Sequence, residues 1–128
     1  MYCLDTDILI HHNRGDKDVI KKVVENSGNL STTYLNVCEL FRGAGLSGNP
    51  EKHRKIAEDT ISNLTILDFS VECARIYSRD YKRLREKGKM IEEFDILIAA
   101  IAKSCNAVLV TRNKKHFEII ENLQTEEW

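Results

Sequence analysis

The chain has 128 residues, of which 42% are hydrophobic and 30% are charged, with one proline and a formal net charge of -1. This profile is typical of a compact protein, so we expect a single domain over residues 1–128 and neither a disordered chain nor a second domain. The small net charge argues against broad, non-specific binding of nucleic acid, which usually requires a basic excess. Any contact with nucleic acid must therefore be local.

Two features of the sequence bear on where the protein acts. No apolar run approaches the roughly 20 residues that cross a bilayer, and Asp5 follows Met1 too closely for a signal peptide, so we expect a cytoplasmic protein without membrane contact. The cysteines are far apart, with no C-x-x-C pair and no histidine at zinc-ligand spacing. We therefore expect reduced, buried thiols and neither disulfides nor a zinc site for the four cysteines, which are Cys3, Cys38, Cys73 and Cys105.

Short apolar segments alternate with amphipathic ones through the first half of the chain. In chain order we expect a buried strand over residues 1–4, a short turn or helix over 8–10, a helix over 16–26, a strand over 30–32, and helices over 35–41 and from 49 to about 62. Asp5 then stands at the C-terminal tip of the first strand. Thr32 or Thr33 is a candidate N-cap for the helix after the second strand, and Gly43 and Gly45 are expected to end that helix.

The second half of the chain continues this alternation. We expect a strand over residues 65–69, a long amphipathic helix from the N-cap Ser70 to about Gly88, a buried helix over 91–104, a strand over 107–110, a short helix over 116–120 and an edge segment near Leu123. Strands that alternate with helices indicate a parallel sheet covered on both faces. The expected fold class is therefore α/β, a three-layer α/β/α sandwich with a central parallel sheet.

Three acidic residues interrupt apolar surroundings at places that this fold brings toward one edge of the sheet. Ligands of an open parallel sheet bind beyond the carboxyl ends of its strands, where Asp5 and the segment 111–113 are expected. Glu39 lies in the helix after the second strand, and Asp95 lies near the start of the buried helix before the fourth strand. Taken singly, Glu39 or Asp95 has an alternative explanation as a helix cap or as the partner of an arginine in a buried ion pair.

Convergence of all three carboxylates is harder to explain in that way. Carboxylates that lie close together raise one another's pKa and destabilise the metal-free fold. A hard cation that takes oxygen ligands relieves this repulsion, and Mg²⁺ or Mn²⁺ is suited to such a site. We therefore predict that Asp5, Glu39 and Asp95 bind Mg²⁺ or Mn²⁺.

Four segments in matching order resemble the PIN-domain family, and most of all its short VapC-type toxins. They are Leu4-Asp5-Thr6-Asp7-Ile8-Leu9-Ile10, Ser31-Thr32-Thr33 leading to Glu39-Leu40, Phe94-Asp95-Ile96-Leu97-Ile98-Ala99-Ala100, and Leu109-Val110-Thr111-Arg112-Asn113 followed by Phe117. The resemblance covers nearly the whole chain, and the ordered set is specific although each segment alone is weak. It implies a PIN-like fold, a metal-dependent endoribonuclease that is the toxin of a toxin-antitoxin pair, a small antitoxin protein as partner, and a homodimer.

Carried over residue by residue, the resemblance assigns the family's acidic ligands to Asp5, Glu39 and Asp95. The family's fourth position, often an aspartate, matches Asn113, which binds a metal ion through water or orients the substrate. This departure leaves open whether the site holds one metal ion or two. In the mechanism that we expect, the metal ions lower the pKa of a bound water, orient it toward a phosphorus of the RNA backbone and neutralise the leaving oxygen.

Three further polar residues are candidates for contact with the RNA. Thr6 and Thr111, at the tips of the first and fourth strands, can donate a hydrogen bond to a carboxylate or a phosphate, and helix capping is an alternative role for Thr6. Arg42 follows Glu39 by three residues on the same helix face. It can reach the scissile phosphate or form an ion pair with Glu39, and the sequence leaves both alternatives open.

Two other patterns in the sequence carry less weight. The segment 43–48 formally matches the G-x-G-x-x-G fingerprint of nucleotide-binding proteins, but it follows a helix instead of a strand, so we interpret it as a helix stop and loop. The histidines form no nucleophile-base pair, because His11 and His12 cannot share a helix face while His53 and His116 stand alone.

Two functions remain as alternatives to a metal-dependent ribonuclease. Asp5-Thr6-Asp7 after a hydrophobic strand looks like the nucleophile motif of haloacid-dehalogenase-like phosphatases. That family would need a lysine and a late pair of acidic residues at strand tips, whereas the fourth strand ends in Thr-Arg-Asn. The second alternative is a PIN-like RNA-binding module that has lost catalysis through Asn113.

Overall fold

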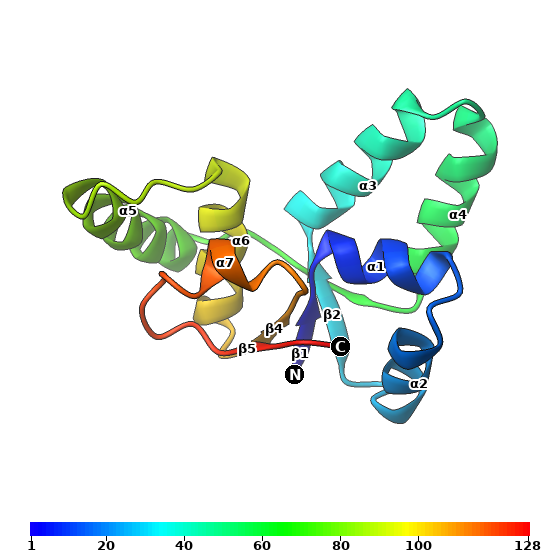
Figure 1. The fold of residues 1–128 in the computed structure, drawn as a ribbon, viewed down its shortest axis with the longest axis horizontal. Helices are drawn as coiled ribbons and strands as arrows, with labels where there is room; N and C mark the ends of the chain where they lie inside the picture. Colours follow the sequence, from blue (N-terminus) through cyan, green and yellow to red (C-terminus); the bar gives the residue numbers. More distant parts are fainter.

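A computed structural model describes every residue of the chain, from Met1 to Trp128. Its centre is a sheet of five parallel strands in the order β3-β2-β1-β4-β5 (Figure 1). The strands are β1 (Tyr2–Leu4), β2 (Leu30–Thr33), β3 (Thr65–Leu67), β4 (Val108–Val110) and β5 (Thr125–Glu126). Because β1 lies in the middle of the sheet, Asp5, the residue after it, stands at the centre of the carboxyl edge.

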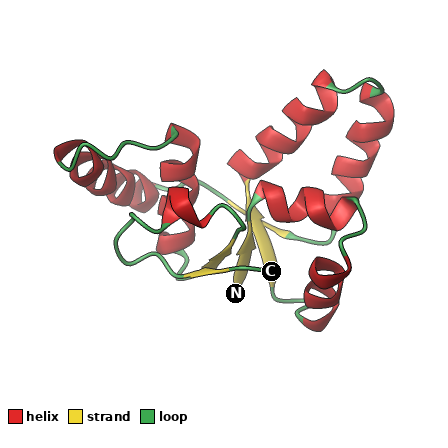
Figure 2. Cartoon of the chain, viewed as in Figure 1, coloured by secondary structure: helices red, strands yellow, loops and turns green.

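Helices cover both faces of this sheet. They are α1 (Thr6–Asn13), α2 (Lys17–Glu25), α3 (Tyr34–Leu46), α4 (Pro50–Ser62), α5 (Val71–Glu86), α6 (Glu93–Ser104) and α7 (Lys114–Phe117). Figure 1 shows α1 to α4 on one side of the strands and α5 to α7 on the other, and Figure 2 shows the same helices, in red, flanking the yellow strands. The predicted three-layer α/β/α sandwich is confirmed.

The strands divide their side chains between two apolar clusters. Cys3 and Leu109 pack in a cluster with α5, α6 and α7, whereas Leu4 and Val110 pack in a second cluster with α1 to α4. This follows from the strand itself, since successive side chains point to opposite faces of a sheet. The strands β1 and β4 are therefore apolar at every position, as is usual for a parallel sheet covered on both sides, whereas β2 carries the buried polar residues Ser31, Thr32 and Thr33.

The helix α3 continues through Gly43 and Gly45 to Leu46, so the expectation that these glycines end it is wrong. Neither glycine has a positive φ, and the helix ends only at Leu46, with Ser47 as its C-cap. Each glycine inside a helix costs about 1 kcal/mol relative to alanine. Ala44 between them is buried and α3 packs along α4, so packing of this helical hairpin outweighs the low helix propensity.

Other elements differ from the expectations by a few residues or in their exposure. The short turn or helix expected over residues 8–10 is the full helix α1, α7 begins earlier than expected, and the edge segment expected near Leu123 is β5. Cys38 and Cys105 are exposed, which contradicts the expectation that all four thiols are buried. No helix is both long enough and apolar enough to cross a membrane.

Candidate active site

Asp5 is held in place by groups from α1, from α3 and from the segment that follows β4. It is the N-cap of α1, only 6% exposed, and its Oδ1 accepts hydrogen bonds from the Thr6 N–H at 2.9 Å and from Asn36 Nδ2 at 3.0 Å. Its Oδ2 accepts a hydrogen bond from Thr111 Oγ1 at 2.8 Å. The carboxylate therefore has a fixed orientation at the tip of β1, and Asp5 rather than Thr6 has the capping role.

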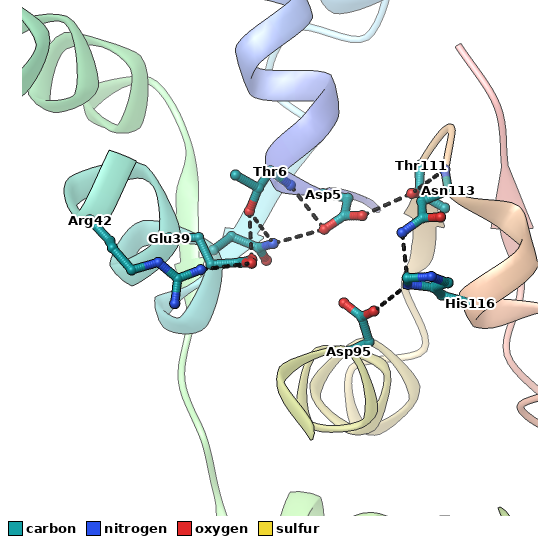
Figure 3. A network of polar contacts seen from close by, with 9 residues as sticks. Asp5, Thr6, Glu39, Arg42, Asp95, Thr111, Asn113 and His116 are labelled. Atoms are coloured by element: carbon teal, nitrogen blue, oxygen red, sulfur yellow. Dashed lines mark hydrogen bonds and ion pairs between the residues drawn. The ribbon is translucent and has the colours of Figure 1, made fainter. Parts of the chain in front are cut away.

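Glu39 reaches the same edge of the sheet from α3 (Figure 3). Its Oε1 accepts a hydrogen bond from Thr6 Oγ1 at 2.8 Å, and its Oε2 lies 3.8 Å from Arg42 Nη2. Arg42 thus forms the ion pair that its spacing allows, and its guanidinium lies over the Phe94 ring at 5.9 Å. The Arg42 side chain is 64% exposed, so this pair is weak and the guanidinium stays accessible.

Asp95 faces the site from the first turn of α6, and its partner is a histidine and not an arginine. Its Oδ2 lies 2.8 Å from His116 Nδ1, and Asn113 Nδ2 lies 2.9 Å from the same ring nitrogen. When Asp95 is ionised its carboxylate can only accept, so Nδ1 then carries the proton, and the Asn113 amide fits this arrangement when its oxygen and nitrogen are exchanged. The expectation that His116 stands alone is wrong.

Two residues of this edge were not singled out in the sequence. Asn36 is fully buried, donates from Nδ2 to Asp5 Oδ1 and Thr6 Oγ1, and accepts from Thr33 Oγ1. Its spacing from the N-cap Thr33 fits a capping box, which signals the cap but not the link to Asp5. Asp7 accepts a hydrogen bond from the Arg112 N–H through Oδ2, while its buried Oδ1 has no hydrogen-bond partner.

The carboxyl groups of the site are hard to ionise together. Burial, followed by the charge of Asp7, raises the pKa of Asp5 to about 7 in spite of the hydrogen bond from Thr111. Burial also raises the pKa of Glu39, and the charge of Asp95 adds to this effect. The pKa of Asp95 is raised by burial and by nearby acidic groups, against the opposing effect of His116. The metal-free protein therefore gains from protonation or from a cation at this edge.

The donor set fits a hard divalent cation that keeps part of its water. As the side chains are placed, no group of three or more acidic, histidine or cysteine side chains is close enough to hold a metal ion. Mg²⁺ usually binds proteins through one or two carboxylates and retains several waters, so this spacing is compatible with it. The raised pKa of Asp5 means that its negative charge is disfavoured without a counter-charge, and Oδ1 of Asp7 has no hydrogen-bond partner, so a cation would stabilise both carboxylates.

Comparison with known proteins identifies the class to which this fold and site belong. The chain is a member of the PIN-domain family, whose sequence model matches residues 2–122. Ribonuclease VapC2 of Haemophilus influenzae is 37% identical over 128 residues, which cover 99% of this chain and 97% of that protein. Within the PIN-domain family the chain groups with the VapC-type toxin ribonucleases, and it is a nuclease.

Two further proteins extend this relationship. The tRNA(fMet)-specific endonuclease VapC of Shigella flexneri is 28% identical over 99% of this chain and 97% of that protein. A chain in the crystal structure of VapBC2 from Rickettsia felis, which was determined with a DNA fragment from the VapBC2 promoter, has the same fold. It matches this chain with a TM-score of 0.94 and 31% sequence identity, over 99% of this chain and 98% of that one. The haloacid-dehalogenase alternative is therefore not favoured.

Proposed function

We propose that the chain is an endoribonuclease that depends on Mg²⁺ or Mn²⁺ bound by Asp5, Glu39 and Asp95. One observation carries this proposal: three carboxylates with raised pKa values face one edge of the sheet, in a chain related to ribonucleases. When bound, a divalent cation supplies a more acidic water for attack on phosphorus and positive charge to neutralise the leaving oxygen.

The hydrogen bonds within the site determine which oxygens remain free for a cation. Asp5 Oδ1 already accepts from two donors, so its Oδ2, which accepts only from Thr111, keeps a lone pair. Glu39 uses Oε1 for Thr6, and Asp95 uses Oδ2 for His116. The free positions are thus Asp5 Oδ2, Glu39 Oε2 and Asp95 Oδ1, one on each carboxylate.

The remaining polar residues of the site hold these ligands or bind substrate in this proposal. Thr6 and Thr111 act as donors that orient Glu39 and Asp5, and Asn113 lies with His116 on the side of Asp95. Arg42 leaves its exposed ion pair with Glu39 at little cost and binds the scissile phosphate. Asn113 is neutral, so it contacts a metal-bound water or the RNA instead of adding charge.

The substrate class and partner of this proposal follow the relatives. The name of the Shigella flexneri relative specifies initiator transfer RNA, and we propose structured RNA of this kind as the substrate. The Rickettsia felis neighbour was crystallised as VapBC2, which supports a small antitoxin as a partner of this chain. We further propose that the protein acts as a homodimer in the cytoplasm.

Cleavage of bulk transfer RNA in Mn²⁺ tests the site assignment. We expect Asp5→Asn, Glu39→Gln and Asp95→Asn each to abolish cleavage with the fold intact, since each removes a metal ligand and not a packing group. Glu72→Gln, which removes an exposed acid of α5, is the matched control and keeps full activity. Full activity in any two of the site variants refutes the assignment. RNA binding by a wild type that never cleaves would instead support the non-catalytic alternative.

A further inference from the structure

A hollow of about 310 Å³ lies beside Glu39, between α1, α3 and α4. We call it the α3 hollow, because α3 contributes more of its lining residues than α1 or α4 does. Glu39 lines it and also belongs to the candidate active site, so a molecule bound there lies against the reaction centre. The rest of its lining is apolar side chains, the backbone of Gly43 and a few polar side chains, which include Asn13, Arg14 and His53.

Gly43 lines the α3 hollow without a side chain that would occupy it. It follows Glu39 by four residues and so lies one turn further along the same face of α3. A Cβ placed on Gly43 meets no atom within 4 Å, so packing inside the chain does not require a glycine there. Glycine weakens the helix at this position, yet it allows a ligand to approach the backbone closely. Gly43 therefore keeps the backbone of α3 accessible to a ligand on the side that lines the hollow.

The polar groups of the α3 hollow are suited to an anion and to the edge of a base. Arg14 and His53 form no salt bridge, although both line the hollow. Asn13 Oδ1 accepts a hydrogen bond from Thr60 Oγ1, which leaves the Asn13 amide N–H groups as donors. The hollow thus offers positive charge, hydrogen-bond donors and apolar walls beside the site proposed to cut RNA.

We propose that the α3 hollow binds the unpaired nucleotide next to the scissile phosphate. This inference rests on the proposed function, because it names where that substrate lies. The base occupies the apolar part over Gly43, and Arg14 binds a backbone phosphate. The size is compatible with one nucleotide, since 310 Å³ is at the low end of the roughly 300–1,000 Å³ of small-molecule sites.

Filling the α3 hollow tests this inference with a matched pair of substitutions. Gly43→Leu places a side chain in the hollow, whereas Gly45→Leu lies in the same helix outside it, and a Cβ at Gly45 also meets no atom within 4 Å. Both changes replace glycine with a strong helix former, so both proteins should fold and melt at or above the wild-type temperature. Any difference between them in RNA cleavage therefore comes from the hollow.

The measurements are kcat and KM for bulk transfer RNA and the affinity for Mn²⁺ of each variant. We expect Gly43→Leu to raise KM by about tenfold or more, because the contacts of one base are lost, with kcat and Mn²⁺ affinity close to those of Gly45→Leu. Arg14→Gln, the second variant, should weaken RNA binding and flatten its dependence on salt, because one phosphate contact is removed.

Equal KM values in Gly43→Leu and Gly45→Leu would overturn the inference. Loss of Mn²⁺ affinity in Gly43→Leu in proportion to the rise of KM would also overturn it, because the leucine would then act through Glu39. A Gly43→Leu protein with unchanged KM and impaired binding of an antitoxin would show that the hollow is a protein-binding site instead. Failure of the wild type to cleave any RNA would refute the proposed function, which is a different result from any of these.

Discussion

Removing the charge of Asp5 should change how the stability of the metal-free protein depends on pH. The fold raises the pKa of Asp5 from 3.8 to about 7, so the folded state takes up a proton at Asp5 more readily than the unfolded state does. A raised pKa of this kind stabilises the fold most below the unfolded value, and that contribution is lost as the pH rises through the folded value. The metal-free wild type should therefore become less stable from weakly acidic to weakly alkaline pH.

The folded and unfolded pKa values of Asp5 set the size of this effect. For one group with these pKa values, the linkage relation gives a loss of about 2 kcal/mol between about pH 5.5 and about pH 8. Glu39 and Asp95, whose pKa values are also raised, act in the same direction. Asp16 and Glu121 have lowered pKa values, so they lose their contributions at more acidic pH, below this window.

Asp5→Asn isolates the contribution of this carboxyl group. Asparagine keeps an oxygen that accepts from Thr6 N–H and Asn36 Nδ2, and its amide can donate to Thr111 Oγ1, so the local structure is retained. Urea unfolding in chelator at both pH values gives the free energy of unfolding of each protein. We expect a slope in the wild type and in the Glu72→Gln control, and a slope smaller by about 2 kcal/mol over the window in Asp5→Asn. A wild type whose stability is flat or rises with pH would refute the reasoning.

Three further predictions concern the other side of the site. In chelator, Asp95→Asn should melt at or above the wild-type temperature, because repulsion between the site carboxylates is relieved and the partner of Asp95, His116, is 43% exposed. The variant should also lose most of the stabilisation by Mn²⁺. In the wild type this stabilisation is about 2.7 kcal/mol when free Mn²⁺ is 100 times its dissociation constant. A large drop in melting temperature in chelator would contradict this. Asn113→Asp should keep cleavage or raise it by strengthening metal binding, and loss of cleavage would mean that Asn113 acts as a hydrogen-bond donor. His116→Ala should lower Mn²⁺ affinity or kcat by about 10–100-fold, since Asp95 loses the group that orients it, and unchanged values for both would contradict that role.

The layers of the fold and the positions of the acidic residues could be predicted from the sequence because both follow local rules. An apolar strand that ends in Asp5 and a buried helix that carries Asp95 place both residues at the carboxyl edge of a parallel sheet. The extent of α3 could not be predicted in this way. Its two glycines argue locally for a helix end, whereas the deciding stabilisation comes from α4, which packs against α3 only in the folded chain.

The partners within the site depend on contacts between distant parts of the chain, and the sequence therefore did not reveal them. His116 meets Asp95 across 21 positions, and Asn36 meets Asp5 across 31, so neither pair has a periodic signal. Asn36 carried a cap signal through its spacing from Thr33, and a buried asparagine in that position needs further partners for its amide. The choice between an ion pair and a free guanidinium for Arg42 likewise required the geometry.

Restoration of RNA cleavage by metal tests the central claim most directly. Wild-type protein is stripped with chelator and incubated with bulk transfer RNA, first without divalent cation and then with an excess of Mg²⁺ or Mn²⁺, with Asp95→Asn beside it. We expect no cleavage in chelator, cleavage by the wild type once either cation is in excess, and none by Asp95→Asn under any condition. Cleavage by the stripped wild type at an undiminished rate in chelator would contradict the claim that Asp5, Glu39 and Asp95 act through a bound metal ion.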